Sequence, residues 1–332
     1  MAVLNEAAVI LTKLENLAQF TYPRDRLRVF VIDGGSTDGT PEIARRWASG
    51  SGIRVEVIVT GRTGKPDQLN LGFAASRAGW VLVTDADSRL ESATLAQMVQ
   101  AAEADPRIRL VGTPVRPVRT HRIDELHWRV ANWFRQLEQR FGSAGIAVGP
   151  AYLAHRDLLA PFPAGTIMDD IHVSCRVALV GGRTAVVPSI VRELRAPLAL
   201  TEMLRHKYRK ALGYLREMLH FLPQAGRMTG PARTAFCIRF AILAALPLIS
   251  AAACGAILTG ALTLPAAAIC LAVLPLAAWL AGSSRPAVSL SSAAMLLPVL
   301  WAATVTLAWL SYPFVHQTAR YPKVTLSSDE LG

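Results

Sequence analysis

The chain has 332 residues, a formal net charge of +11 and a hydrophobic fraction of 52%, and its length allows two domains of ordinary size. The four cysteines show no metal-type spacing, which argues against a disulfide framework. Charge and hydrophobicity are segregated, because residues 1–239 hold 32 of the 35 basic and 22 of the 24 acidic side chains. The first part is therefore predicted to be soluble and basic, and the remainder to lie in a membrane.

The chain opens with a helix-like segment that begins almost at Met1, NEAAVILTKLENL. We therefore expect most of the sheet strand that should precede Asn5 to be missing. The first ten residues, MAVLNEAAVI, lack the basic start and long apolar core of a cleavable signal. This predicts that the soluble part stays in the cytoplasm.

Short β-rich runs alternate with helical segments up to residue 113. Strands are predicted at 28–32, 53–59, 80–84 and 108–113. Helices are predicted from Thr40, from Pro66 and from Glu91. Such alternation implies right-handed crossovers and a mostly parallel sheet covered on both faces, an α/β scaffold of the kind that binds nucleotides.

Two acidic motifs lie where predicted strands end. Asp33 follows the run VFVI, and Asp85 and Asp87 follow the run WVLV. Ligands of such open sheets gather at the carboxyl ends of the strands, and a D-x-D pair there can share a divalent cation that bridges phosphate oxygens. Lys65 is predicted to be a counter-charge to phosphate. Taken singly, Asp33 could instead be a turn former, the D-x-D an exposed loop pair and Lys65 a solvated surface charge.

Further motifs follow these in a fixed order along the chain. The full succession is N-E at 5–6, VIDGGSTDGT, GKPDQLNLGFAASRAG, VTDADSRL, MDDIHVSCRVALVGGR and RHKYRKALG. This order resembles the family-2 glycosyltransferases of the GT-A fold, a large inverting family that includes cellulose, chitin and hyaluronan synthases. The resemblance covers roughly residues 1–215 and implies a Rossmann-like mixed sheet with membrane helices after the catalytic domain.

The resemblance implies a role for each motif residue. Asp33 would bind the nucleotide base, Lys65 and Asp85 would face the nucleotide sugar, and Arg209 would reach the diphosphate. Asp87 would hold Mn²⁺ or Mg²⁺ against the diphosphate.

Asp170 matches the catalytic aspartate of the family. The reaction needs such a group, because an acceptor hydroxyl is a poor nucleophile until a carboxylate takes its proton. The neighbouring Asp169 is predicted to favour a helix start, since carboxylates are stabilising beside the positive end of a helix.

The sequence departs from the family pattern in two further places. Gly34 stands where a second aspartate is expected after Asp33. Polymerising members carry Q-x-x-R-W, whereas residues 206–210 read HKYRK, so that only Arg209 is retained. Because the missing tryptophan normally helps to form the acceptor site, we predict a non-processive enzyme that adds one or a few sugars.

Apolar side chains recur at helical spacing through residues 201–222, with basic residues largely on the other faces. This pattern indicates either a basic amphipathic helix at the membrane interface or a helix packed on the catalytic core. We assign residues 1–200 to a cytoplasmic GT-A catalytic domain and 201–233 to amphipathic interface helices.

Long uncharged runs follow residue 239. A membrane span needs about 20 apolar residues, and three spans are predicted near 237–258, 263–282 and 289–312. Residues 234–315 are accordingly assigned to the membrane region and 316–332 to a tail. The prediction is a multi-pass protein of the cell membrane, with basic residues at the cytoplasmic side.

The leading hypothesis is therefore a membrane glycosyltransferase that moves a sugar, with inversion, from a nucleotide sugar to a lipid or polysaccharide acceptor. A UDP-sugar is the default donor. The first alternative is a membrane-anchored nucleotide-binding protein without catalysis, and the second is a phosphotransferase, which would need a D-x-D-x-T arrangement that Asp33 does not begin. Nucleic acid is not expected as a partner, because no aromatic and basic platform is present.

Overall fold

The computed structural model describes residues 1–62, 64–147, 149–197, 199–259 and 290–315. Its first three strands, β1 (Ala2–Val3), β2 (Arg28–Asp33) and β3 (Arg54–Val59), form a parallel sheet in the order β1-β2-β3. The strand that precedes Asn5 is present as two residues, with Ala2 opposite Ile32 and Val3 opposite Asp33. β2 and β3 match the predicted runs to within one residue at each end.

A second sheet has the order β4-β8-β6-β9, from β4 (Trp80–Thr84), β8 (Ala151–His155), β6 (Ile108–Gly112) and β9 (Arg183–Val186). β8 runs antiparallel to both β4 and β6, whereas β6 and β9 are parallel. The sheet is therefore mixed, as the family resemblance implies. The mostly parallel sheet that the alternation predicted is wrong at β8, because that strand was not recognised.

A third, smaller sheet joins β5 (Ser88–Arg89), β10 (Val191–Glu193) and β7 (Val115–Pro117), with β10 in the middle. β10 is antiparallel to β5 and parallel to β7. This sheet brings the residues after β10 beside the segment that follows β4. Its position matters for the site, because β5 begins directly after Asp87.

Helices α1 (Ala7–Ala18), α2 (Thr40–Ala48), α3 (Lys65–Ala75) and α4 (Thr94–Ala104) alternate with the first strands, as predicted. Their apolar faces form a core with the sheet in which Ile10, Leu14 and Met98 are fully buried. Burying one such side chain contributes about 1.5–3 kcal/mol. Short 3-10 turns lie at Arg24–Arg26, Arg156–Leu158 and Leu222–Arg227.

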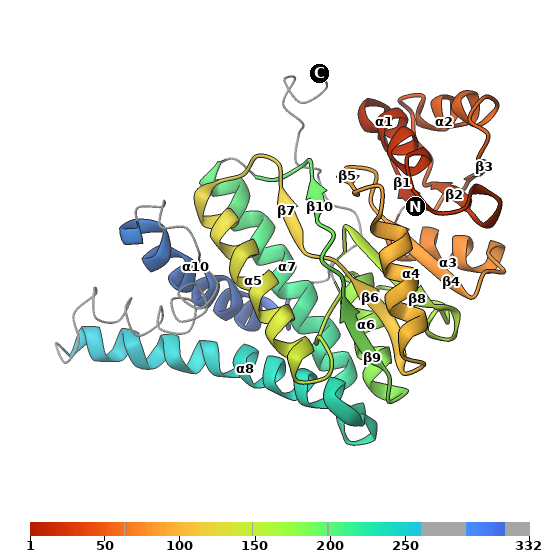
Figure 1. Ribbon diagram of the computed structural model, residues 1–332. Coiled ribbons are helices and arrows are strands. Elements are labelled where there is room, and N and C mark those ends of the chain that lie inside the picture. Colours follow the sequence, from red (N-terminus) through yellow and green to blue (C-terminus); the bar gives the residue numbers. More distant parts are fainter. Residues whose placement is uncertain (63, 148, 198, 260–289, 316–332) are drawn as a thin grey trace.

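The later helices are α5 (Arg122–Arg140), α6 (Asp169–Leu179), α7 (Leu200–Phe221), α8 (Gly230–Leu258) and α10 (Leu290–Ser311). Figure 1 shows α5, α7, α8 and α10 grouped on one side of the molecule and α1 to α4 with β1 to β4 on the other, with α6 and most of the remaining strands between them. α5 was not predicted. Its Asn132 side chain donates to the Val115 carbonyl (2.8 Å) and accepts from the Val115 amide (3.1 Å), which fixes the helix to β7.

α7 coincides with the predicted amphipathic helix. Its apolar side chains Leu212, Leu215 and Met218 are buried in a cluster that also includes Ile171 of α6 and Phe236 of α8. This packing favours the prediction of a helix held on the catalytic core. Leu215 and Met218 are fully buried, so this face of α7 is not available to lipid.

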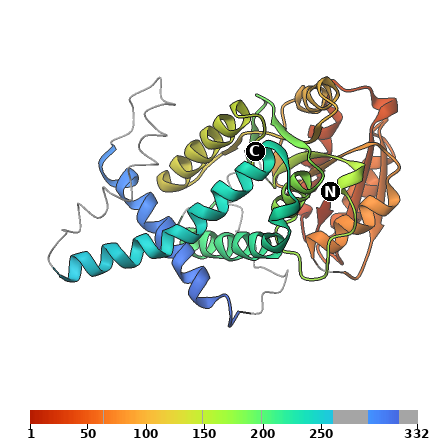
Figure 2. The same ribbon diagram turned by 90° about the horizontal axis from the view of Figure 1, so that it is seen from below.

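Among the described residues, one stretch, Gly230–Ile249 of α8, is long and apolar enough to cross a membrane. The same search finds one shorter apolar helical stretch, Trp301–Ser311, within α10. The predicted span at 263–282 lies outside the described residues. α8 and α10 cross at the end of the molecule away from β1 to β3 (Figure 2), and the Trp309 indole donates to the Leu243 carbonyl at 3.1 Å. The multi-pass topology therefore remains a prediction.

α8 is also joined to α5 by an ion pair. The guanidinium of Arg239 donates to both carboxylate oxygens of Glu138 on α5, each at 2.7 Å. Glu138 accepts a third hydrogen bond, at 2.9 Å, from the Gly145 amide. The Arg239 and Glu138 side chains are 15% and 10% exposed, so this pair is largely removed from water.

Candidate active site

The turn at residues 33–40 is held by its own aspartates. Asp33 ends β2, and its buried carboxylate accepts from the amides of Gly35 and Ser36 (both 2.9 Å) and from the Ser36 hydroxyl. These bonds are those of a turn-forming aspartate. The predicted role of Asp33 in binding a nucleotide base stays a prediction.

The same turn is tied to the start of α1. The Asn5 side chain accepts from the Thr37 amide at 2.9 Å, and the Asp38 carboxylate accepts from the Ala7 amide at 2.9 Å. Burial alone would raise the pKa of Asp38, but hydrogen bonds from Thr40 and Ala7 outweigh it and lower that pKa. Every described contact of Asp38 therefore favours its charged form.

Gly34 occupies the place where the family pattern has a second aspartate. A Cβ added at Gly34 would lie 3.0 Å from Nε2 of Gln68 and 3.1 Å from the Arg62 carbonyl oxygen. That Gln68 amide donates to the carbonyls of Val3 (2.8 Å) and Ile32 (2.7 Å), so it cannot move without loss of both bonds. In this chain Gln68 takes the space that a side chain at position 34 would need.

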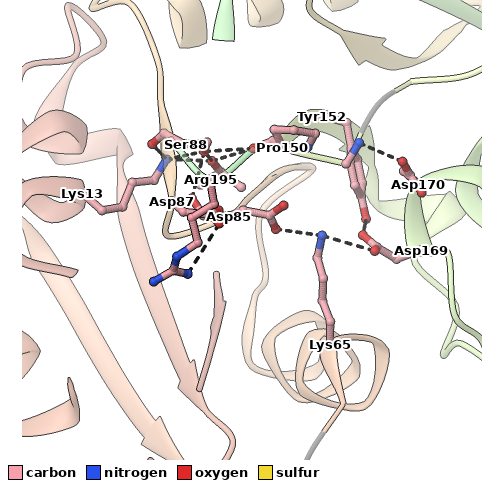
Figure 3. Close-up of polar contacts among 12 residues, drawn as sticks. Lys13, Lys65, Asp85, Asp87, Ser88, Pro150, Tyr152, Asp169, Asp170 and Arg195 are labelled. Atoms are coloured by element: carbon pink, nitrogen blue, oxygen red, sulfur yellow. Dashed lines mark hydrogen bonds and ion pairs between the residues drawn. The ribbon is translucent and has the colours of Figure 1, made fainter. Parts of the chain in front are cut away.

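Lys65 stands between two aspartates from different elements. It is the first residue of α3, and its Nζ lies 2.8 Å from Asp85 and 3.3 Å from Asp169, as Figure 3 shows. Burial would lower the pKa of Lys65, but the charges of Asp169 and Asp85 outweigh it and raise that pKa well above its usual value. Lys65 therefore stays protonated and joins the segment after β4 to the start of α6.

Asp169 and Asp170 form the first turn of α6, as the sequence predicted, and both are buried. Asp169 does more than start the helix, because its carboxylate also accepts from the Tyr152 hydroxyl at 2.8 Å. Asp170 accepts from the amides of Gly149 (2.8 Å) and Ile171 (2.9 Å). Burial, and then the charge of Asp169, raise the pKa of Asp170 to about 6.

Asp87 lies at the other side of this group, beside a cation that the sequence analysis missed. Nη1 of Arg195 is 2.6 Å from the Glu6 carboxylate and 3.5 Å from the Asp87 carboxylate. Burial and the nearby charge of Asp85 raise the pKa of Asp87 to about 6, although Arg195 acts in the opposite direction. Arg195 follows β10, more than a hundred residues from Asp87, so no local pattern points to it.

The structure thus brings three predicted site residues, Asp85, Asp87 and Asp170, together with Asp169. We call Asp85, Asp87, Asp169 and Asp170 the carboxylate cluster. Arg209 is less directly placed: it lies on α7 with its guanidinium 3.2 Å from Nδ1 of His206. Lys210, also on α7, acts on Asp170 through its charge, which opposes the overall rise in the pKa of that carboxyl. The Lys210 ammonium lies 5.2 Å from the centre of the Trp128 ring.

The carboxylate cluster fits a divalent cation that is shared with a ligand. Three of its four carboxylates lie at ion-pair distance from a cation: Asp85 and Asp169 from Lys65, and Asp87 from Arg195, which is shared with Glu6. Within the described ranges no three His, Cys, Asp or Glu side chains are arranged to hold a metal by themselves. Mg²⁺-type sites on phosphate substrates need only one or two carboxylates, because phosphate oxygens and water complete the shell. The prediction that Asp87 holds the cation stays a prediction.

Comparison with known proteins agrees with this geometry. Residues 1–160 match the family model for glycosyl transferase family 2. A β-monoglucosyldiacylglycerol synthase from a Nostoc species is 27% identical over 194 residues, which cover 54% of this chain and 40% of that enzyme. Hyaluronan synthase 1 of Xenopus tropicalis is 23% identical over 273 residues, covering 62% of this chain and 46% of that enzyme. The chain thus spans less than half the length of either relative.

Among solved structures, the mannosyltransferase PcManGT from Pyrobaculum calidifontis, in complex with GDP-Man and Mn²⁺, superimposes with a TM-score of 0.69. It is 26% identical, and the match covers 94% of this chain and 85% of that one. The likeness therefore extends over the helices that follow the sheets. Together with the match of residues 1–160, it shows that this chain carries a glycosyltransferase family 2 domain with a GT-A-like fold.

Proposed function

We propose that the protein transfers a sugar from a nucleotide sugar to an acceptor hydroxyl with inversion at the anomeric carbon. The observation that carries this proposal is the convergence of Lys65, Asp85, Asp87 and Asp170 from three separate segments on one buried to half-buried group of charges. A protein that only held its fold together would gain little from burying Asp169 and Asp170 beside the half-buried Asp85 and Asp87, because each carboxylate that loses water costs free energy unless it is paired.

Asp170 is the proposed general base. Two backbone amides hold its carboxylate in place. A pKa of about 6 leaves it mostly ionised at neutral pH while it remains able to accept a proton. It would take the proton from the acceptor hydroxyl as that oxygen attacks the anomeric carbon, and the nucleoside diphosphate would leave from the opposite face.

Asp87 and Lys65 are the proposed donor-side groups. When bound, a divalent cation at Asp87 supplies Lewis-acid stabilisation of the charge that develops on the leaving diphosphate. The ammonium of Lys65 is held permanently charged by Asp85 and Asp169 and would add a second positive centre for the donor. Asp33 and Arg209 are proposed, on the family pattern, to contact the base and the diphosphate.

The acceptor is proposed to be a lipid or a glycan at a membrane, and the enzyme to be non-processive. The membrane is supported by the apolar Gly230–Ile249 stretch and by exposed apolar side chains on α8 and α10, such as Leu248 (73% exposed) and Leu310 (67% exposed). Non-processivity is supported by Lys210, which replaces the tryptophan of polymerising members. The catalytic domain is proposed to face the cytoplasm.

The test is a donor screen with the purified full-length protein in detergent, using UDP- and GDP-sugars, Mn²⁺ or Mg²⁺, and a membrane lipid extract. UDP is the default base by resemblance, and GDP enters because the solved mannosyltransferase holds GDP-Man. Release of nucleoside diphosphate that depends on metal and on lipid extract supports the proposal. If no nucleotide sugar is consumed under any of these conditions, the nucleotide-binding alternative without catalysis takes its place.

A further inference from the structure

A lysine lies at the centre of the amino-terminal core. Lys13 is on the face of α1 that also carries Val9, Ile10 and Leu17, and it is fully buried. Lysine is almost never fully buried unless its ammonium is paired. A buried lysine in an apolar helix face therefore calls for an explanation from its contacts.

All three protons of the Lys13 ammonium have acceptors beside the D-A-D motif. Nζ donates to the Thr84 hydroxyl (2.8 Å), the Ser88 carbonyl (2.9 Å) and the Ser88 hydroxyl (3.0 Å). Thr84 and Ser88 are the residues that flank Asp85, Ala86 and Asp87. Lys13 is thus hydrogen-bonded to both ends of the segment that carries the donor-side carboxylates.

The ammonium also decides where the two hydroxyls point. In its protonated form Lys13 can only donate, so both hydroxyl oxygens then accept from it, and their own single protons are left for other acceptors. The Thr84 hydroxyl lies 3.0 Å from the Pro150 carbonyl oxygen, and the Ser88 hydroxyl lies 3.1 Å from it and 2.9 Å from the Asp85 carbonyl. The Asp85 amide donates to the same Pro150 carbonyl at 3.2 Å.

Pro150 is adjacent in the chain to a residue that contacts the proposed base. The residue before it, Gly149, donates its amide to Asp170 at 2.8 Å. Hydrogen bonds therefore run from Lys13 through the Thr84 and Ser88 hydroxyls to the Pro150 carbonyl, and the adjoining Gly149 amide donates to Asp170. Figure 3 shows Lys13, Ser88, Pro150 and Asp170 along this path. It joins the two halves of the carboxylate cluster, which come from segments more than eighty residues apart.

We propose that Lys13 is a positioning residue for the transfer reaction: it fixes the segment of Asp85 and Asp87 against the Gly149–Pro150 segment that holds Asp170. The inference rests on the proposed function for its consequence in catalysis, but the structural link can be measured without any substrate. Lys13 touches no reacting atom, since its Nζ is enclosed by Thr84 and Ser88. Its effect would be on the spacing between the donor side and the base.

The key substitution is Lys13→Met, which keeps the length of the apolar stem and removes the ammonium. Amide hydrogen exchange of the full-length protein in detergent should rise about tenfold or more in peptides that cover 84–88 and 149–152. The matched control is Leu14→Ala, a fully buried neighbour on the same helix, which should loosen α1 without this selective change. Equal exchange profiles for the two variants, or unchanged exchange in both peptides of Lys13→Met, would overturn the proposal.

The catalytic consequence is tested with the nucleotide sugar that the donor screen selects. Release of nucleoside diphosphate by Lys13→Met should fall in kcat by about 10–100-fold, the range seen when an outer-shell partner is removed, with the donor KM changed less than about threefold. Lys13→Gln keeps N–H donors on a shorter stem and should recover part of that loss. A normal kcat in Lys13→Met contradicts the proposal.

Lys13→Met could fail to fold, and Thr84→Val then decides. It has nearly the shape of threonine and removes the hydroxyl that lies between Lys13 and Pro150. Exchange at 149–152 should rise in this variant too, and wild-type exchange there would refute the link. If no nucleotide sugar is a substrate, the proposed function fails while the exchange result still tests the role of Lys13.

Discussion

The turn at 33–40 and the carboxylate cluster both depend on aspartates, yet their charges are balanced in opposite ways. In the turn, backbone amides and hydroxyls of the same few residues satisfy Asp33 and Asp38. In the cluster, three of the four carboxylates pair with two cations, and the pKa values of Asp87 and Asp170 rise to about 6. The charges of the turn aspartates are satisfied by hydrogen bonds, whereas the cluster has an excess of negative charge that a bound cation or a proton would neutralise.

This difference distinguishes aspartates that stabilise the fold from aspartates that are available for chemistry. Groups whose charged form is satisfied locally stabilise the fold and respond weakly to ligands. Groups whose charged form is only partly satisfied are the ones that bind a metal, take a proton or do both. Substitutions in the cluster should therefore change rates, and substitutions in the turn should change stability.

The largest expected effect is that of Asp170→Asn. Asparagine keeps the shape but cannot accept the acceptor proton, so the transfer rate should fall by about 10²- to 10⁴-fold. Binding of nucleoside diphosphate with Mn²⁺, measured by calorimetry, should change little. Asp169→Asn is the companion variant: it weakens the partner of Lys65 and should act mainly on donor binding. If Asp169→Asn abolishes transfer while Asp170→Asn remains active, the base is Asp169.

Next in size is Asp87→Asn, which tests the cation site. Loss of this carboxylate should raise the Mn²⁺ concentration for half-maximal activity and lower the rate by about 10²-fold, consistent with the several kcal/mol that a Lewis acid contributes. Activity of the wild type should disappear with a chelator and return with Mn²⁺. The control is Asp25→Asn, an exposed aspartate outside the site. Unchanged metal dependence in Asp87→Asn would remove Asp87 from the metal site.

The pH dependence follows from the raised pKa of Asp170. The base acts in its ionised form, so the rate should be full well above pH 6 and decline as pH falls through the value of about 6. Below that midpoint the loss approaches tenfold per pH unit for one titrating group. The residual activity of Asp170→Asn should lack this acid limb. A limb that persists there belongs to another group, of which Asp87 is the first to test.

A smaller effect is expected from Gly149→Ala. The added Cβ would lie 3.2 Å from the Asp170 carboxylate, so the base must shift by a few tenths of an ångström. Since a misplacement of about 1 Å can cost 10²-fold, a loss of several-fold in transfer is expected, with normal thermal stability. Gly50→Ala has no neighbour within 4 Å of its new Cβ and serves as the control. Equal rates in the two variants would mean that the contact with Asp170 is not limiting.

The smallest effect is predicted in the turn. Asp38→Asn weakens hydrogen bonds to a charged but exposed carboxylate, worth about 1 kcal/mol, which is roughly 2–4 °C in Tm for a domain of this size. Because the pKa of Asp38 is lowered, its contribution is present at neutral pH and is lost as pH falls through the folded pKa. Transfer should stay within about twofold. A large loss of rate with an unchanged Tm would break the distinction between turn and cluster.

Local pattern predicted the elements up to residue 113 because each was either a branched apolar run or an amphipathic segment with a clear start. β8 was missed because Ala151–His155 is short and rich in alanine. α5 was missed because charged and polar side chains are interspersed among its apolar ones, so that polar Asn132 and apolar Trp128 both face Val115 of β7. Lys65, Asp85 and Asp170 were predicted from motifs, and the structure places them close together. That meeting depends on sheet order, which pattern alone does not determine.

The site residues that were missed are those whose role exists only in three dimensions. Arg195 and Tyr152 reach Asp87 and Asp169 from distant strands. Lys13 could have been noticed as a lysine within the apolar face of α1, but the sequence analysis counted it only as one of the basic residues. A charged residue on an otherwise apolar helix face is therefore worth testing as a buried partner before it is treated as a surface group.

The pair between Arg239 and Glu138 has a practical consequence for making a shorter, water-soluble enzyme. A truncation before Gly230 would remove Arg239 and leave the Glu138 carboxylate, which is 10% exposed, with the Gly145 amide as its remaining described partner. Breaking such a pair by removal of one member costs about 3–5 kcal/mol, a large part of the stability of a typical domain. A crystallisable catalytic fragment should therefore end after Arg239, or carry Glu138→Gln.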